Sequence, residues 1–195
     1  MRAWLRRVSP RDVREAGEAI ARRLGTHPAW RQAATVALYA SLPGEVATAT
    51  LISTAWAEGR RLLLPRVVGE GDLVFVEHLP DVPLVGGAFG VLEPPGHARV
   101  VDLDEAELIL VPGLAFDRRG GRLGRGAGYY DRALAGIGLP AARRATADRD
   151  GSVPRTMGVA FDRQLVDEVP MGEQDVRMEA VVSPSAVHAG TGQSG

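Results

Sequence analysis

The sequence contains no cysteine and no lysine among its 195 residues. Without cysteine, the chain can form neither disulfides nor zinc sites with thiolate ligands. The net charge is only −1 and aromatic residues make up 5% of the chain, which argues against nucleic-acid binding through basic surfaces and base stacking. No apolar run approaches the ~20 residues of a membrane-spanning helix. We therefore expect neither a nucleic acid nor a membrane as a partner.

The composition is otherwise ordinary for a globular protein, with 45% hydrophobic and 24% charged residues. The first residues, MRAWLRR, lack the apolar core of a signal peptide, so we expect a cytoplasmic protein. The length predicts a single domain, which we place at residues 1–187, and we expect a monomer. Residues 188–195 are small and polar and predict a frayed tail.

Short apolar runs alternate with amphipathic stretches along the chain. Helices are predicted over residues 10–25 and 46–58 and after Gly128, and strands over 35–40, 61–65, 73–76, 108–111, 157–161 and 180–182. This alternation predicts an α/β fold with three layers, α/β/α, and a mostly parallel sheet with a peripheral hairpin. Ligands of such sheets bind beyond the carboxyl ends of strands. Because the loops with Glu45 and Arg122 both follow strands, we expect them to share one site.

The most informative stretch spans residues 108–134, LILVPGLAFDRRGGRLGRGAGYYDRAL. A buried strand leads into a loop with five glycines and four arginines, and a helix follows. Glycines let backbone N–H groups approach an anion, and arginine matches phosphate oxygens. The stretch favours a phosphate-binding loop, although a solvated basic turn has a similar composition. The P-loop, which needs lysine, and the dinucleotide fingerprint, whose third glycine is Tyr129 here, do not fit.

The segments PGLAFD (112–117) and RLGRGAGYYD (122–131) together resemble the signature of the 5-formyltetrahydrofolate cyclo-ligase family, also called methenyltetrahydrofolate synthetase. The resemblance implies closure of 5-formyltetrahydrofolate to 5,10-methenyltetrahydrofolate, driven by ATP with Mg²⁺, with release of ADP and phosphate. The formyl oxygen would attack the γ-phosphoryl group, and nitrogen 10 of the same folate would then close the ring. Since both nucleophiles belong to the substrate, the protein supplies positive charge and alignment.

The resemblance also implies roles for individual residues. The expected ATP-binding residues are Arg2, Arg6, Arg122, Gly124, Arg125, Gly126, Ala127, Gly128, Tyr129 and Tyr130. The expected folate-binding residues are Ala40, Glu45, Phe89, Arg125 and Tyr129. Arg125 and Tyr129 are the expected catalytic residues, and Asp131 and Asp175 are the expected Mg²⁺ ligands. Two positions depart from the family, because Arg2 replaces a lysine and Ala127 stands where some relatives carry one.

Without the resemblance, several of these residues have simpler interpretations. Arg2 and Arg6 fit a solvated basic segment, and Glu45 fits an acidic residue at a helix start. Phe89 fits a core residue, and Asp175 fits a surface residue. The alternative to an enzyme is a non-catalytic relative that binds folate or a nucleotide. The arginine and aspartate of the loop signature are both present, and this favours the enzyme.

Overall fold

The computed structural model describes residues 1–69, 71–87, 90, 92–137 and 154–190. One eight-stranded sheet forms its centre, and the strand order across it is β13-β12-β10-β7-β1-β2-β3-β6. In chain order these strands are β1 (Thr35–Ala37), β2 (Arg61–Val68), β3 (Asp72–Glu77), β6 (Val100–Val101), β7 (Leu108–Val111), β10 (Arg155–Val159), β12 (Ala180–Val182) and β13 (Val187–Ala189). Neighbouring strands from β12 to β2 are parallel, whereas β13, β3 and β6 pair antiparallel at the two edges.

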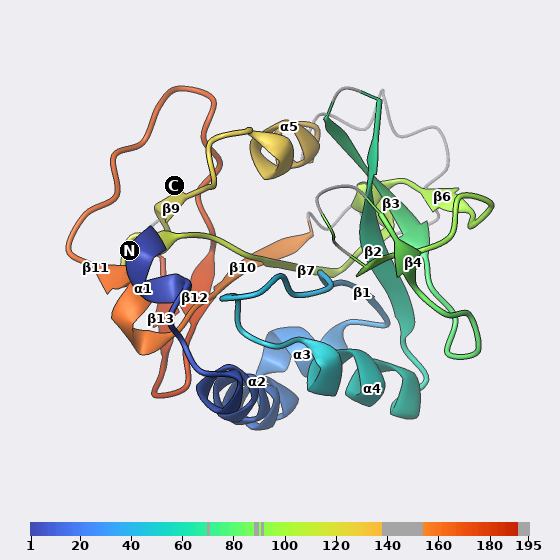
Figure 1. Cartoon of the computed structure of the whole chain (residues 1–195), viewed down its shortest axis with the longest axis horizontal. Helices are drawn as coiled ribbons and strands as arrows, with labels where there is room; N and C mark the ends of the chain where they lie inside the picture. The colour runs from blue at the N-terminus through green and yellow to red at the C-terminus, as the bar shows by residue number, and fades with distance from the viewer. Residues whose placement is uncertain (70, 88–89, 91, 138–153, 191–195) are drawn as a thin grey trace.

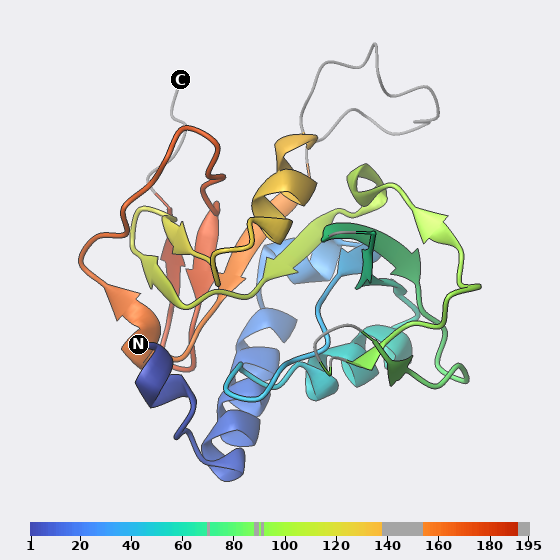
Figure 2. The same cartoon turned by 45° about the horizontal axis from the view of Figure 1, so that its top comes forward.

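Helices cover both faces of this sheet (Figure 1). Below it in that view lie α2 (Pro10–Gly25), α3 (Pro28–Gln32) and α4 (Ala49–Ala57), and above it lies α5 (Tyr129–Ala135). The short α1 (Arg2–Leu5) lies beside β11 (Leu165–Val166) in both cartoon views (Figures 1 and 2). In the described ranges, no helix is long and apolar enough to cross a membrane. The predicted three-layer fold with a mostly parallel sheet and a peripheral β2–β3 hairpin is confirmed.

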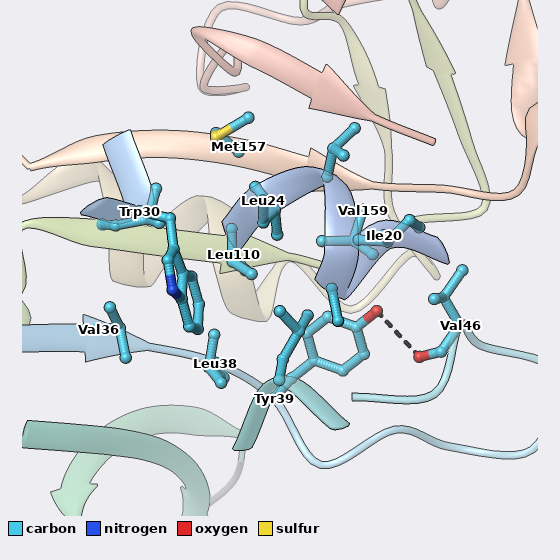
Figure 3. Packing of buried hydrophobic residues seen from close by; sticks show 14 of the residues in the cluster. Ile20, Leu24, Trp30, Val36, Leu38, Tyr39, Val46, Leu110, Met157 and Val159 are labelled. Carbon is cyan, nitrogen blue, oxygen red and sulfur yellow. Dashed lines mark hydrogen bonds between the residues drawn. The ribbon is translucent and has the colours of Figure 1, made fainter. Parts of the chain in front are cut away.

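Alternating side chains of the central strands build one hydrophobic cluster on each face. In β7, Leu108 and Leu110 belong to the cluster under α2 and α4, whereas Ile109 and Val111 belong to the cluster under α5. Because successive strand residues point to opposite faces, a strand covered on both faces is apolar at every position. Figure 3 shows the larger cluster, in which Ile20 and Leu24 of α2 pack with Leu110 of β7 and Val159 of β10.

Helix α4 begins later than the sequence predicts. The expected start was residue 46, but the helix begins at Ala49. The residues before it are held in a turn, because the Tyr39 hydroxyl donates to the Val46 carbonyl at 3.3 Å and the Thr48 hydroxyl donates to the Tyr39 carbonyl. These two bonds tie the start of α4 to the loop that leaves β1.

The structure also contains several strands of two or three residues outside the central sheet. A small sheet contains β11, β8 (Ala115–Asp117) and β9 (Arg122–Leu123). A separate hairpin pairs β4 (Val85–Gly86) with β5 (Leu92–Glu93). Asp117 supports the turn after β8, because its carboxylate accepts hydrogen bonds from the backbone of Arg119, Gly121 and Val169. These short elements hold the glycine-rich loop that follows β9.

The predicted tail at residues 188–195 is wrong at its start. His188 and Ala189 belong to β13, which pairs antiparallel with β12, and the Gly190 N–H donates to the Glu179 carbonyl at 2.7 Å. The Ser185 hydroxyl also donates to the Asp162 carboxylate at 2.6 Å. The sheet therefore continues through residue 189, and residues 191–195 lie outside the described residues.

The connections that leave β1 and β7 run in opposite directions across the sheet. β1 continues through α4 to β2 on one side, whereas β7 continues by way of α5 to β10 on the other side. These connecting helices also lie on opposite faces (Figure 1). In open α/β sheets, the crevice beyond the carboxyl ends of two such strands is the usual ligand site. The topology therefore predicts a ligand site at the segments that follow Ala37 and Val111.

We expect truncation after Pro184 to destabilise the protein, because it removes β13 and the Ser185–Asp162 bonds. The melting temperature should fall by roughly 5 °C or more, since each kcal/mol corresponds to about 2–4 °C in a chain of this length. A second truncation after Gly190 keeps β13 and serves as the control in the same thermal-melting experiment. Equal melting temperatures for the two truncated chains would contradict a stabilising role for β13.

Candidate active site

A cavity of about 490 Å³ opens beyond the carboxyl ends of β1 and β7. The loop after β1 contributes Ala40 and Glu45, and Pro112 and Gly113 follow β7 directly. The glycine-rich loop and the start of α5 line another part of the wall with Arg122, Gly124, Arg125, Ala127, Gly128, Tyr129, Tyr130 and Asp131. This volume lies within the range of ~300–1,000 Å³ typical of small-molecule sites. The two loops that the sequence assigned to one site do line one cavity.

Glu45 and Arg125 join the loop after β1 to the glycine-rich loop. One carboxylate oxygen of Glu45 accepts from Arg125 Nη2 at 3.0 Å and from Nε at 3.2 Å, and the other accepts from the Leu42 N–H at 2.9 Å. The Glu45 side chain is buried, whereas about half of the Arg125 side chain is exposed. Burial raises the pKa of Glu45, and the Leu42 N–H and Arg125 only partly oppose this shift. A buried carboxylate thus orients an arginine toward the cavity.

Arg122 and Asp131 form a second ion pair at the base of the loop. The Arg122 side chain is almost fully buried, its guanidinium donates to Asp131 Oδ1, and its Nε has no partner among the described residues. The same guanidinium lies 5.9 Å from the centre of the Tyr130 ring. Burial raises the pKa of the Tyr130 phenol far above its ordinary value, so this hydroxyl stays neutral at physiological pH. Arg122 therefore supports the loop from beneath.

Arg132 fixes the far end of the glycine-rich loop, and the sequence did not point to it. Its guanidinium donates to the carbonyl of Ala127 at 2.9 Å and to the carbonyl of Gly71 at 2.5 Å. It also lies 5.6 Å from the centre of the Tyr129 ring. The ring packs on Gly71, where a Cβ atom would lie 2.6 Å from Cε1 of the tyrosine. The i, i+3 spacing of Tyr129 and Arg132 on a helix could have predicted that these two side chains lie close together.

Arg2 and Arg6 of the N-terminal segment reach a second, adjoining cavity of about 310 Å³, which Arg125 and Pro43 also line. Arg2 Nη2 donates to the Arg125 carbonyl at 2.7 Å. α1 can approach this closely because of Gly44, whose φ is +82° and whose missing Cβ would lie 2.6 Å from the Leu5 carbonyl oxygen. Three arginines from two distant parts of the chain thus border one small cavity, as binding of a polyanion requires.

Three of the expected site residues are not placed in either cavity. Gly126 lies in the loop, with a φ of +103°, but does not line the cavities. Asp175 lines neither cavity, and its Oδ2 accepts from the Gly172 N–H at 2.7 Å. Phe89 lies outside the described residues. Within the described ranges, no group of three or more His, Cys, Asp or Glu side chains is arranged to hold a metal ion.

Comparisons with known proteins identify similar sequences across nearly the whole chain. The sequence model of the 5-formyltetrahydrofolate cyclo-ligase family matches residues 1–184. The chain is 34% identical over 185 residues to 5-formyltetrahydrofolate cyclo-ligase of Escherichia coli (strain K12), which covers 93% of this chain and 95% of the relative. It is 37% identical over 187 residues to the protein of the same name in Mycolicibacterium smegmatis, covering 92% of this chain and 88% of the relative.

Solved structures are similar over the same extent. The 5,10-methenyltetrahydrofolate synthetase of Aquifex aeolicus superposes with a TM-score of 0.77 at 28% identity and covers 99% of this chain and 90% of its own. A 5,10-methenyltetrahydrofolate synthetase of Mycoplasma pneumoniae superposes with a TM-score of 0.67 at 17% identity and covers 93% of each chain. The similarity to the Mycoplasma pneumoniae protein supports the fold alone. The Aquifex aeolicus protein is similar to this chain in both sequence and structure.

We expect Glu45→Gln to stabilise the protein at neutral pH. The raised pKa means that ionisation of Glu45 is less favourable in the folded than in the unfolded chain, so stability falls as pH rises from about 4.5 through the folded pKa. The amide carries no charge and can still accept from the Leu42 N–H. The melting temperature of Glu45→Gln should exceed that of the parent at pH 8, and the difference should vanish near pH 4.

Thermal melts at both pH values measure this difference. Glu18→Gln, at an exposed position of α2, is the matched control and should show no such pH dependence. A Glu45→Gln variant that is less stable than the parent at pH 8 would show that the Arg125 ion pair outweighs the cost of burial.

Proposed function

The chain belongs to the 5-formyltetrahydrofolate cyclo-ligase family, and from this we propose that it converts 5-formyltetrahydrofolate to 5,10-methenyltetrahydrofolate with conversion of ATP to ADP and phosphate. The formyl oxygen attacks the γ-phosphoryl group and displaces ADP. Nitrogen 10 of the same folate then attacks the activated carbon, and loss of phosphate and of the proton on nitrogen 10 completes the ring. Both nucleophiles belong to the folate, so the protein has to bind two substrates and bring them together.

One observation carries this proposal: the two cavities meet at Arg125. The larger cavity has a volume suited to a folate ring system, and the smaller one is bordered by the guanidinium groups of Arg2, Arg6 and Arg125. Arg125 and Pro43 border both. A reaction between a folate oxygen and a γ-phosphoryl group requires such a junction, with positive charge where the phosphoryl group is transferred.

We assign the larger cavity to the folate and the smaller one, with the glycine-rich loop, to the nucleotide. Ala40, Glu45 and Tyr129 line the larger cavity and are the proposed folate contacts within the described residues. Arg2 stands where the family has lysine, but arginine supplies the same charge together with a planar fork that matches phosphate oxygens. Its bond to the Arg125 carbonyl places it against the loop, which supports a role in nucleotide binding.

Asp131 is the proposed protein ligand for Mg²⁺. Mg²⁺ keeps several water molecules and binds one or two carboxylates together with substrate phosphates, so a carboxylate that lines the larger cavity beside the glycine-rich loop fits it. The ion would neutralise charge on the phosphates. Asp131 has one oxygen paired with Arg122, which holds the carboxylate at the base of the loop. Asp175, the second proposed ligand, lies outside the lining of both cavities.

The activity is tested by following the absorbance of methenyl-folate as it forms from 5-formyltetrahydrofolate. Product should appear only when ATP and Mg²⁺ are both present, together with stoichiometric ADP and phosphate. A non-catalytic relative that only binds folate or nucleotide would give no product under any of these conditions.

Arg125→Ala should lower kcat by about two or more orders of magnitude, because it removes a charged donor from the point of phosphoryl transfer. The fold should survive, since the side chain is half exposed. Arg118→Ala is the matched control, because Arg118 is exposed and lines neither cavity. Near-normal turnover of Arg125→Ala would remove this residue from the site.

Asp131→Asn should raise the Mg²⁺ concentration needed for half-maximal activity by about tenfold or more, as expected for the loss of a charged ligand. A melting curve separates this effect from loss of the ion pair with Arg122. The same titration with Asp175→Asn tests the second proposed ligand. An unchanged Mg²⁺ requirement in either variant would return that carboxylate to a purely structural role.

A further inference from the structure

Glu93 of β5 lines the same larger cavity as Glu45. The residue is 6% exposed. Its only hydrogen bond with the described residues is from the Val67 N–H to Oε1, at a long 3.4 Å. It forms no ion pair with an arginine or histidine in the described ranges. A carboxylate can accept about four hydrogen bonds, so most of this capacity is unused.

Glu45 and Glu93 therefore differ in the hydrogen bonds that they can still accept. Glu45 accepts three hydrogen bonds from Leu42 and Arg125, and the arginine also balances its charge. Glu93 has neither a compensating cation nor a full set of donors among the described residues. Burying a carboxylate in this state is costly, and the cost is recovered when a ligand supplies the missing donors.

The position of the Glu93 carboxylate is set by close packing. It lies directly against the backbone of Gly87, where a Cβ atom would lie 2.2 Å from Oε2 and 2.3 Å from the carboxyl carbon. On its other side, Oε1 faces the Val67 N–H of β2. The carboxylate is held between Gly87 and Val67 at the cavity wall, and this packing restricts its orientation.

The surroundings of Glu93 suit one edge of a flat ring. Pro65 and Val67 of β2 and Leu73 of β3 line the same cavity and provide apolar surface for ring faces. A single carboxylate beside such a surface recognises a ring edge that carries adjacent N–H donors. The 2-amino group and the neighbouring ring N–H of a reduced pterin form such an edge.

We propose that Glu93 recognises the 2-amino and ring N–H donors of the folate and thereby determines specificity for the pterin. This inference rests on the proposed function, because it names the group that orients the folate in the larger cavity. Glu45 lines the same cavity and also holds Arg125 at the junction with the nucleotide. Glu93 then binds the edge of the substrate, and Glu45 orients the catalytic arginine.

The test compares the parent with Glu93→Gln on two ligands, 5-formyltetrahydrofolate and its analogue that lacks the 2-amino group. The parent should favour the natural substrate in KM by about tenfold or more, the effect of hydrogen bonds to a charged group. In Glu93→Gln, which replaces one acceptor oxygen with a donor, the KM for the natural substrate should rise about tenfold and the preference should nearly disappear. The KM for ATP should stay within about twofold of the parent.

Two further variants separate recognition from structure. Leu92→Ala, at an exposed neighbour on the same strand, should behave as the parent in every assay. Gly87→Ala should reproduce the loss of preference, because the new Cβ displaces the Glu93 carboxylate while the Gly87 φ lies outside the left-handed region. Glu93→Gln should melt no lower than the parent, since removing a poorly compensated buried charge does not destabilise the fold.

A Glu93→Gln variant that keeps the parent's preference for the 2-amino substrate would overturn this assignment and leave the proposed function intact. Equal losses of affinity for both ligands, with a lower melting temperature, would also overturn it, because they indicate a structural role. A parent protein that neither binds nor converts 5-formyltetrahydrofolate would overturn the proposed function, and the role of Glu93 with it.

Discussion

The ion pair between Glu45 and Arg125 is the contact on which the architecture of the site depends. It joins residues 80 positions apart, one after β1 and one in the glycine-rich loop. The sheet brings these loops together because β1 and β7 are neighbours whose connections diverge. The buried carboxylate fixes the half-exposed guanidinium, so the arginine is oriented without being removed from solvent. Preorganisation of this kind is what electrostatic stabilisation of a phosphoryl group requires.

The N-terminal segment depends on the same loop. α1 packs against Gly44, and Arg2 donates to the backbone of Arg125, so the side chain held by Glu45 and the backbone held by Arg2 belong to one residue. At the other end, Arg132 ties Ala127 to the β2–β3 hairpin. A loop rich in glycine has little rigidity of its own. Its shape here comes from arginines that bind its carbonyl groups from outside.

The sequence predicted those features that depend on local pattern. The apolar run at 108–111 identified a strand buried on both faces, and glycines interleaved with arginines identified the loop. The short strands β4, β5 and β13 contain too few apolar positions to show a period, and they form only against partners elsewhere in the chain. Arg132 and Glu93 were missed for the same reason, since their partners Gly71 and Val67 lie 61 and 26 residues away.

Buried charged side chains in this cavity lower the stability of the fold, but they can bind polar substrates. Glu45, Glu93 and Arg122 are each at most 8% exposed, and each carries a charge whose burial opposes folding. Arg122 has an unpaired Nε among the described residues, and Glu93 has one long hydrogen bond. Apolar side chains of similar size would pack here at lower cost, but they could not bind a pterin edge or phosphates. Substrates in the larger cavity can supply the hydrogen-bond partners that Arg122 and Glu93 lack among the described residues.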